Sequence, residues 1–354
     1  MHIAFCNNAP VKEARSLFAA GEYPEQKLWG APELERGGHK VSYVDVSGRS
    51  PILERLSEKL RWRLGELPTE RALLGLGRKM SGVDLFYAGA EQTLAGLALL
   101  RRVGLCRKPV VCVYHNPPRP LMNSVALGYD LAFALTKKAY SGLLAAGRTP
   151  NSTVLIPWGP QMGWVAYRPT GRDYLISCGK SSRDIDTLAC AATQLNTPTV
   201  IYCSDGWHPR EANVTPNLTL RRFSRVVSYP DVIADMAGAF AVAIPLARTD
   251  RAVALSELAD AFALGKPVIV TRSDYIDFNV EDIGCGITVN VKDIDGWTRA
   301  IARLDGDRAL AAEMGARGKS FAEQHWSAAI AARLIRSSLE ERFDHRAAHQ
   351  FIDE

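Results

Sequence analysis

The sequence lacks the features of membrane-spanning, secreted and zinc-binding proteins. No apolar run in its 354 residues approaches the length that crosses a bilayer. The chain begins like a strand at Met1–Cys6, without the basic stretch and apolar core of a signal peptide. Its seven cysteines are scattered and form no CxxC pair, which favours reduced core residues over disulfides or a zinc site. We therefore expect a soluble, cytoplasmic protein without a bound metal.

Two common nucleotide-binding motifs are also missing. No Gly-x-Gly-x-x-Gly follows a predicted strand, which argues against an NAD-dependent dehydrogenase. The sequence Gly179-Lys180-Ser181 matches the end of a P-loop, but Tyr174 occupies the position of the leading glycine. We reject both interpretations and expect no cofactor.

Short apolar runs rich in β-branched residues alternate with helical patterns along the chain. Continuous apolar runs of this kind are typical of parallel strands buried on both faces. They are Ile3–Cys6, Val41–Val46, Leu85–Tyr87, Val110–Tyr114, Leu131–Leu135 and Val154–Ile156, then Leu175–Cys178, Val200–Cys203, Arg225–Val227, Ala241–Ile244, Val268–Val270 and Ile287–Val289. Two such sets predict an α/β fold with two Rossmann-like domains.

The domain limits follow from composition. Pro157–Gly163 contains two prolines and two glycines, and is the natural linker. We place the first domain at residues 1–160 and the second at 161–330. A helical pattern over 308–343, interrupted near Gln324–Ser327, predicts a C-terminal helix and tail at 331–354.

The two halves of the chain differ in charge. Residues 1–163 contain 21 Lys and Arg against 13 Asp and Glu, a net charge of +8, and the remainder has a net charge of −3. Residues 49–79 hold eight basic and four acidic side chains, and leucines 53, 56, 60 and 64 form one stripe of an amphipathic helix over 52–64. This helix fits an anionic acceptor or membrane surface, and equally a core-facing helix with a solvated side.

The most informative segment is 256–271. An apolar-faced helix runs into a Gly-Lys-Pro turn at 265–267, and a β-branched strand follows directly. The glycine can adopt the left-handed backbone that a helix C-terminus favours, and the proline prevents continuation. Three polar residues lie near the helix start: Ser256, Glu257 and Asp260. Free N–H groups at a helix start bind phosphate, and an acid there can hold ribose hydroxyls. The pattern indicates a nucleotide-diphosphate site; the alternative is an ordinary helix–turn–strand.

A second candidate segment follows the predicted strand Leu175–Cys178. Gly179 permits close approach of a ligand, and Lys180 and Arg183 could neutralise a diphosphate. The alternative is a solvated basic turn. Because Lys266 and the helix start at 256 are expected nearby, we assign this turn to the same diphosphate site.

His115 is the candidate in the first domain. It comes directly after the predicted strand Val110–Tyr114 and before a proline-rich loop. Open α/β sheets bind ligands at the carboxyl ends of their strands. His115 could therefore hydrogen-bond a substrate, or alternatively a loop carbonyl.

These segments resemble the donor-binding region of retaining glycosyltransferases of family 4. That family has the GT-B fold, in which two Rossmann-like domains face each other across a cleft and a C-terminal helix crosses back to the first. Its Glu-Ala-Met-Ala-x-Gly-Lys-Pro-Val-Ile pattern corresponds to Asp-Ala-Phe-Ala-Leu-Gly-Lys-Pro-Val-Ile at 260–269, and its Gly-His-x-Val turn to 38–41. The resemblance implies a nucleotide-diphosphate sugar as donor substrate, transfer to an acceptor hydroxyl with retention of configuration, and no required metal.

The resemblance also implies roles for particular residues. Lys180 and Arg183 would stabilise the departing diphosphate, although the family has Arg and Lys in the opposite order. Asp260 would bind the donor ribose and His115 would face the transferred sugar. The segment whose backbone reads the nucleobase corresponds to Ser228 and Tyr229.

The chain departs from the family pattern at two places. The first of the family's two acids falls on Ala252, for which Asp250 or Glu257 could substitute. In place of a glycine-rich loop after the first strand there is a long 7–25 loop, ahead of a helix predicted over Gln26–Arg36. We assign to the acceptor side Asn7, Asn8 and Gly21.

Two other functions fit the same fold. One is a nucleotide-sugar 2-epimerase, which would need acids at the anomeric centre. The other is a non-catalytic nucleotide-sugar-binding protein, motivated by Ala252. The nucleobase, the sugar and the acceptor stay open. We expect an anionic or lipid-linked acceptor, a peripheral contact with the inner membrane face, and no nucleic-acid partner.

Overall fold

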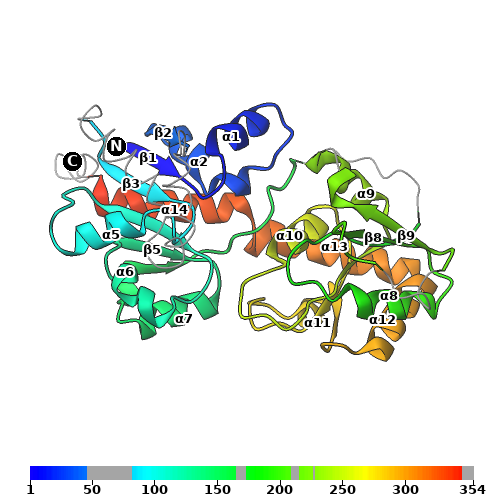
Figure 1. Ribbon diagram of the computed structural model, residues 1–354. Coiled ribbons are helices and arrows are strands. Elements are labelled where there is room, and N and C mark those ends of the chain that lie inside the picture. Colours follow the sequence, from blue (N-terminus) through cyan, green and yellow to red (C-terminus); the bar gives the residue numbers. More distant parts are fainter. Residues whose placement is uncertain (46–81, 165–172, 209–214, 226–227, 345–354) are drawn as a thin grey trace. The chain divides into compact units, whose positions relative to one another are not determined.

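A computed structural model describes residues 1–45, 82–164, 173–208, 215–225 and 228–344. The chain forms two compact units: Met1–Trp158 with the residues described from Ala328 onward, and Gly159–Ser327. Each unit contains a six-stranded parallel sheet flanked by helices (Figure 1). This architecture confirms the predicted α/β fold with two Rossmann-like domains. The amphipathic pattern at 52–64 lies outside the described residues.

The first unit has the strand order β2-β1-β3-β4-β5-β6, with every neighbouring pair parallel. Its strands are β1 (His2–Cys6), β2 (Lys40–Val44), β3 (Leu85–Ala88), β4 (Val110–Tyr114), β5 (Leu131–Ala134) and β6 (Thr153–Leu155). Its helices are α1 (Val11–Ala19), α2 (Ala31–Arg36), α5 (Ala95–Arg102), α6 (Asn123–Ala126), α7 (Lys137–Ala145) and α14 (Ala328–Phe343).

The second unit has the order β12-β11-β10-β7-β8-β9, again all parallel. Its strands are β7 (Leu175–Ser177), β8 (Thr199–Cys203), β9 (Leu218–Arg222), β10 (Ala241–Ile244), β11 (Val268–Thr271) and β12 (Gly286–Val289). Its helices are α8 (Ile185–Thr193), α9 (Tyr229–Gly238), α10 (Leu255–Ala263), α11 (Val280–Ile283), α12 (Ile294–Gly306) and α13 (Arg308–His325). None of the helices described in either unit is long and apolar enough to cross a membrane.

Both faces of the second sheet are buried. Ile176 and Val242 belong to one hydrophobic cluster, while Leu175 and Ala241, their neighbours along β7 and β10, belong to another. Alternate residues of a strand point to opposite faces. A sheet covered on both sides therefore needs the continuous apolar runs seen in the sequence.

One predicted strand is wrong. Arg225 ends a short 3-10 turn, and residues 226 and 227 lie outside the described part. The strand at this place is β9, Leu218–Arg222, which forms the edge of its sheet. Four of its five residues are half-buried, and Thr219 is exposed. Its mixed polar sequence therefore carries no continuous apolar signal.

The predicted long loop after β1 is also wrong. Helix α1 occupies Val11–Ala19 inside it, and the Oδ1 atom of Asp45 accepts hydrogen bonds from the helix's first N–H groups at 2.6 and 3.0 Å. The helix predicted over Gln26–Arg36 is broken, because Trp29 and Gly30 have left-handed backbones with φ of 50° and 76°. A 3-10 turn precedes this break, and α2 follows it.

The last helix, α14, packs in the first unit against α2 (Figure 1). A Cβ atom at Gly30 would lie 3.3 Å from Cδ1 of Ile335, so glycine permits this close approach. Polar contacts add to it: Nε2 of His39 lies 3.0 Å from Oε1 of Glu340, and an Arg336–Glu33 ion pair spans 3.0 Å. The first unit therefore consists of two segments of the chain, with α14 packed onto the segment Met1–Trp158.

Candidate functional site

Two of the predicted donor segments of the second unit meet at the carboxyl edge of its sheet, after β7 and β10. Helix α10 begins at Leu255, directly after Ala254, which has a left-handed backbone with φ of 74°. Ser256 is half-buried in its first turn. Glu257 and Asp260 stand one turn apart and are buried, with 5% and 8% of their surfaces exposed. The predicted helix start, with its two acids, is therefore where the sequence placed it.

Glu257 is paired with Arg183 from the loop after β7. Nη2 of Arg183 lies 2.5 Å from Oε2 of Glu257, and each side chain is 5% exposed. The Cys178 N–H donates to Oε1 of Glu257 at 3.0 Å, and Nη1 of Arg183 donates to the carbonyl of Ser181 at 2.6 Å. Burial, reinforced by the negative Glu257, raises the pKa of the Cys178 thiol well above its usual value. The pair ties the loop after β7 to α10, and the charge of Arg183 is already balanced.

Gly179 makes room for this arginine. A Cβ atom at this position would lie 1.9 Å from Nη2 and 2.1 Å from Nε of Arg183. Any other residue would displace the guanidinium. The sequence predicted that a ligand approaches Gly179 closely; in the structure the side chain of Arg183 occupies that position.

Lys180 is the second cation of this loop. Its side chain is exposed, and no carboxylate pairs with it in the part of the chain that the structure describes. Its ammonium lies 4.7 Å from the centre of the Phe223 ring, within the range of a cation–π contact. This contact could not be predicted from local sequence, because Phe223 and Lys180 are 43 residues apart in the chain.

Asp260 is held by Tyr229. The Tyr229 hydroxyl donates to Oδ2 of Asp260 at 2.5 Å, and the Tyr229 ring packs 5.8 Å from that of Trp164. Ser228 caps α9, accepting from the Asp231 N–H at 3.4 Å and donating to its carboxylate at 2.8 Å. The structure thus brings Tyr229 to the acid that was predicted to bind ribose.

Asp250 lies apart from this cluster. It is exposed, and its carbonyl accepts a hydrogen bond from the Tyr275 hydroxyl. Among the described residues, no hydrogen bond or ion pair joins its carboxylate to Arg183 or Lys180. Of the two acids suggested as substitutes at Ala252, only Glu257 belongs to the cluster.

Lys266 is not near the diphosphate loop, so that expectation is wrong. Gly265 does adopt the predicted left-handed backbone, with φ of 64°. The turn joins the end of α10 to the start of β11, however, and therefore lies at the amino edge of the sheet. There a Cβ atom at Gly315 of α13 would lie 3.2 Å from Cα of Lys266. Burial lowers the pKa of Lys266, and Asp173 offsets part of this effect.

In the first unit, His115 lies at the carboxyl end of β4, as predicted. Its Nε2 lies 2.9 Å from the carbonyl of Gly89, so Nε2 carries a proton and donates it. Its backbone N–H donates to Oε2 of Glu91 at 3.2 Å, and its ring lies 4.8 Å from that of Trp29. The loop carbonyl that the sequence allowed as an alternative partner is present. Trp29 and Glu91 are neighbours that sequence reasoning missed, although Glu91 follows a predicted strand and could have been noticed.

The three predicted acceptor-side residues are not all together. Asn7 lies beside Gly89, where a Cβ atom would be 3.0 Å from Cγ of Asn7, and the carbonyl of Gly89 is the partner of His115. Asn8 is exposed, and its N–H donates to Oδ1 of Asn7 at 2.8 Å. Gly21 instead ends α1 with φ of 74° and has no atom within 4 Å of its Cβ position. In the described residues, no three His, Cys, Asp or Glu side chains gather closely enough to hold a metal ion.

Comparison with solved structures identifies the fold. Sucrose-phosphate synthase from Thermosynechococcus elongatus aligns over 97% of this chain and 99% of its own, with 16% identity and a TM-score of 0.73. HepE from Anabaena, in complex with UDP and glucose, aligns over 96% of this chain and 100% of its own, with 14% identity and a TM-score of 0.66. The chain has the GT-B fold.

Other comparisons leave the biochemical function open within the GT-B fold. A Listeria monocytogenes protein assigned as a UDP-N-acetylglucosamine 2-epimerase aligns over 97% of this chain and 96% of its own, with 12% identity and a TM-score of 0.55. No family model matches the sequence, and no curated protein matches it. Solved structures that share the fold thus include a synthase and a protein assigned as an epimerase, and the fold alone does not distinguish between these activities.

Proposed function

We propose that this GT-B protein is a glycosyltransferase that moves a sugar from a nucleotide-diphosphate sugar to an acceptor hydroxyl. The observation that supports this most is the cluster at the carboxyl edge of the second sheet. Two buried acids, Glu257 and Asp260, stand one turn apart at the start of α10, beside a loop that presents the exposed cation Lys180. Helix starts and cations at this edge of an α/β sheet suit a nucleotide diphosphate.

Uridine nucleotides are the first donors to test. HepE, which shares the fold over its whole length, has been crystallised with UDP and with UDP-glucose. In our proposal Asp260, positioned by Tyr229, accepts hydrogen bonds from the donor ribose. The backbone near Ser228 and Tyr229 meets the nucleobase.

Lys180 would stabilise the departing diphosphate. Negative charge develops on the leaving phosphate as the bond to the sugar breaks, and a fixed cation stabilises that charge. Arg183 would contribute by holding the loop in place through Glu257. We further propose retention of configuration without a metal ion: the acceptor hydroxyl attacks from the face that the phosphate leaves, and the phosphate oxygen takes its proton. His115 and Asn7 are proposed contacts of the transferred sugar and the acceptor.

Thermal stabilisation by ligands tests the binding part of the proposal. A ligand that binds only the folded state raises the melting temperature. UDP, GDP, ADP and their sugars should be compared, and at least one should stabilise the protein by several degrees. The Lys180→Ala variant should lose most of that shift while melting normally without ligand. If no nucleoside diphosphate shifts the melting temperature, the proposed donor site is wrong.

Product analysis separates transfer from the alternatives. A transferase releases the nucleoside diphosphate in proportion to the glycosylated acceptor. The Listeria neighbour is the reason for testing a 2-epimerase, which converts the donor to its epimer without needing an acceptor. A binding protein leaves the donor unchanged over a long incubation with a broad acceptor panel. Turnover that is independent of every acceptor and yields an epimer would replace the transferase proposal.

A further inference from the structure

The connection between α5 and β4 has an apolar tip between two basic pairs. It reads Arg-Arg-Val-Gly-Leu-Cys-Arg-Lys over 101–108, and we call it the apolar–basic loop. Val103 and Leu105 at its tip are 67% and 75% exposed. Arg102, Arg107 and Lys108 beside them are exposed as well. A single exposed apolar side chain is ordinary, whereas neighbouring exposed apolar side chains rimmed by polar residues mark a contact site.

The protein fixes this tip in its exposed position. The N–H groups of Leu105 and Cys106 both donate to the carbonyl of Leu100, at 2.9 and 3.1 Å. Arg101 donates to the carbonyls of Cys106 and Arg107 at 3.2 and 3.1 Å, and its guanidinium contacts both carboxylate oxygens of Asp130 at 2.9 to 3.1 Å. The loop is therefore tied down at its base, and the fold itself holds the apolar side chains outward.

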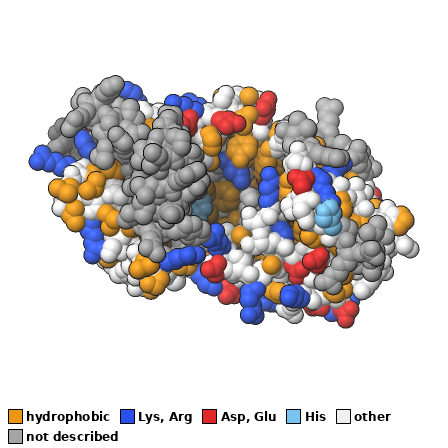
Figure 2. Space-filling view, viewed as in Figure 1, with side chains coloured by type: hydrophobic (Ala, Val, Ile, Leu, Met, Phe, Trp, Pro, Cys, Tyr) orange, Lys and Arg blue, Asp and Glu red, His pale blue; other side chains and the backbone are white. Residues whose placement is uncertain are grey.

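The charges around the tip are not neutralised. Among the described residues no carboxylate pairs with Arg102, Arg107 or Lys108, and no Asp or Glu occurs in the sequence between Glu91 and Asp130. A further apolar side chain, Leu121, is 83% exposed just before α6, which packs against α5. Figure 2 shows hydrophobic and basic side chains interspersed over the part of the first unit formed by α5 and α6. This combination favours a surface that is both apolar and anionic.

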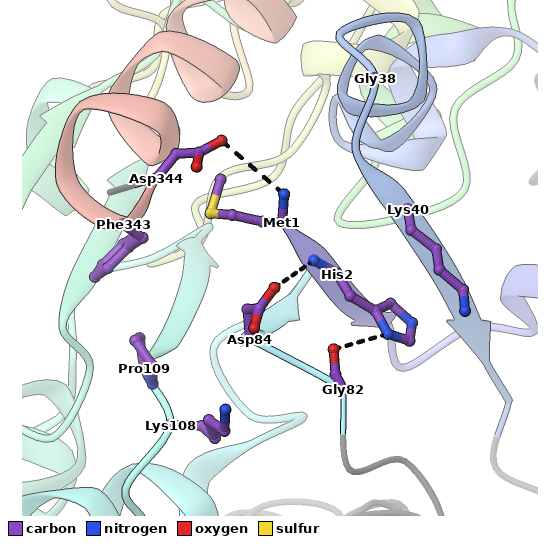
Figure 3. Close-up of a pocket in the computed structure, with 10 residues that line it drawn as sticks. All are labelled: Met1, His2, Gly38, Lys40, Gly82, Asp84, Lys108, Pro109, Phe343 and Asp344. Carbon is purple, nitrogen blue, oxygen red and sulfur yellow. Dashed lines mark hydrogen bonds and ion pairs between the residues drawn. The ribbon is translucent and has the colours of Figure 1, made fainter. Parts of the chain in front are cut away.

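A pocket adjoins the loop at the amino edge of the first sheet. It has a volume of about 810 Å³, and its lining includes Lys108, Lys40, His2, Asp84 and Asp344 (Figure 3). Both carboxylates are occupied within the protein: Asp84 accepts the His2 N–H at 2.8 Å, and Asp344 lies 4.0 Å from the terminal ammonium. The two lysines are exposed and have no ion-pair partner among the described residues. The positive charges of Lys40 and Lys108 are therefore available to bind an anionic head group in the pocket.

We propose that the apolar–basic loop docks the protein on an anionic phospholipid bilayer. Val103 and Leu105 enter the boundary between head groups and acyl chains, and Arg102, Arg107 and Lys108 contact lipid phosphates. The pocket beside Lys108 receives one head group. Loop and pocket lie at the amino edge of the sheet, whereas His115 lies at its carboxyl edge, so docking leaves the His115 edge uncovered. This proposal does not depend on the sugar-transfer function.

Flotation with lipid vesicles tests the docking surface. The intact protein should bind vesicles of equal parts phosphatidylcholine and phosphatidylglycerol, and should bind pure phosphatidylcholine weakly. The Val103→Ser/Leu105→Ser variant should bind at least about tenfold more weakly, since burying each apolar side chain is favourable. The Arg107→Gln/Lys108→Gln variant should lose about fivefold per removed charge, and more at low salt.

Matched controls come from the second unit. Val291 is an exposed apolar side chain, at 39%, and Arg299 and Arg303 are exposed cations on α12. Val291→Ser and Arg299→Gln/Arg303→Gln should leave vesicle binding unchanged. Absence of binding to the anionic vesicles would overturn the proposal, as would equal losses in loop and control variants. If the loop variants instead changed only the oligomeric state measured by light scattering, the tip would be a protein contact and the lipid proposal would be wrong.

Discussion

Removing Arg183 should destabilise the protein far more than removing an exposed arginine. In the structure the Arg183–Glu257 pair is 5% exposed on both sides, with a 2.5 Å contact. Arg183→Ala leaves a buried carboxylate whose remaining hydrogen-bond donors, among the described residues, are the N–H and thiol of Cys178. Breaking a buried pair from one side costs about 3–5 kcal/mol. Since each kcal/mol shifts the melting temperature of a unit of this size by about 2–4 °C, we expect a loss of roughly 6–20 °C.

Two further variants make this test specific. Arg317 pairs with Glu313 on α13, where the two side chains are 52% and 59% exposed. Arg317→Ala should therefore change stability by less than about 1 kcal/mol. The double variant Arg183→Met/Glu257→Leu removes both buried charges and should recover most of the lost melting temperature. Calorimetry without ligand measures all three. If Arg183→Ala melts like the parent protein yet loses nucleotide binding, Arg183 is a ligand and the structural role is refuted.

Four other expectations can be tested alongside. Lys180→Ala should weaken nucleoside-diphosphate binding about tenfold or more, measured by calorimetric titration, with an unchanged melting temperature; unchanged affinity would remove Lys180 from the site. Asp260→Ala should discriminate less than the parent between ribose and 2′-deoxyribose donors, and Tyr229→Phe should do so to a smaller degree; a parent that ignores the 2′-hydroxyl contradicts this. Burial lowers the pKa of Lys266, so the folded state is destabilised by its charged form at every pH below the folded pKa, and this penalty disappears as the pH rises to the ordinary lysine pKa. Lys266→Met should therefore raise the free energy of unfolding at pH 7 by up to about 1 kcal/mol without altering nucleotide binding. A loss of nucleotide binding in this variant would place Lys266 in the site. Turnover should survive a chelator, and restoration by magnesium after complete loss would overturn the metal-free leaving-group model.

The sequence predicted most of the fold because its strands are buried on both faces. Val110–Tyr114 and Ala241–Ile244 are continuous apolar runs, and the structure has strands at both. The strand Leu218–Arg222 was missed because it lies at a sheet edge and needs no such run. The break at Trp29 and Gly30 was missed because a tryptophan in the left-handed region is set by its surroundings, including the bond from the Tyr87 hydroxyl to its carbonyl at 2.7 Å.

The sequence predicted those parts of the site that depend on neighbouring residues, and missed contacts between residues far apart in the chain. The start of α10 and the turn at Gly265 depend on neighbouring residues, so the sequence could locate them. The pairing of Arg183 with Glu257 joins residues 74 positions apart, and no local pattern encodes it. Lys266 was misplaced because the sequence motif was considered without its geometry: a turn between a helix and the next parallel strand lies at the edge opposite to the helix start.

The position of α14 imposes an order on the making of this protein. The second unit, Gly159–Ser327, is one continuous stretch of chain that can fold as soon as it leaves the ribosome. The first unit is complete only once α14, which packs against α2 and follows the second unit in the chain, has been synthesised. Until then Gly30 and His39 lack their partners Ile335 and Glu340. The first unit is therefore completed after the second, and a chain truncated before Ala328 lacks the helix that packs against α2.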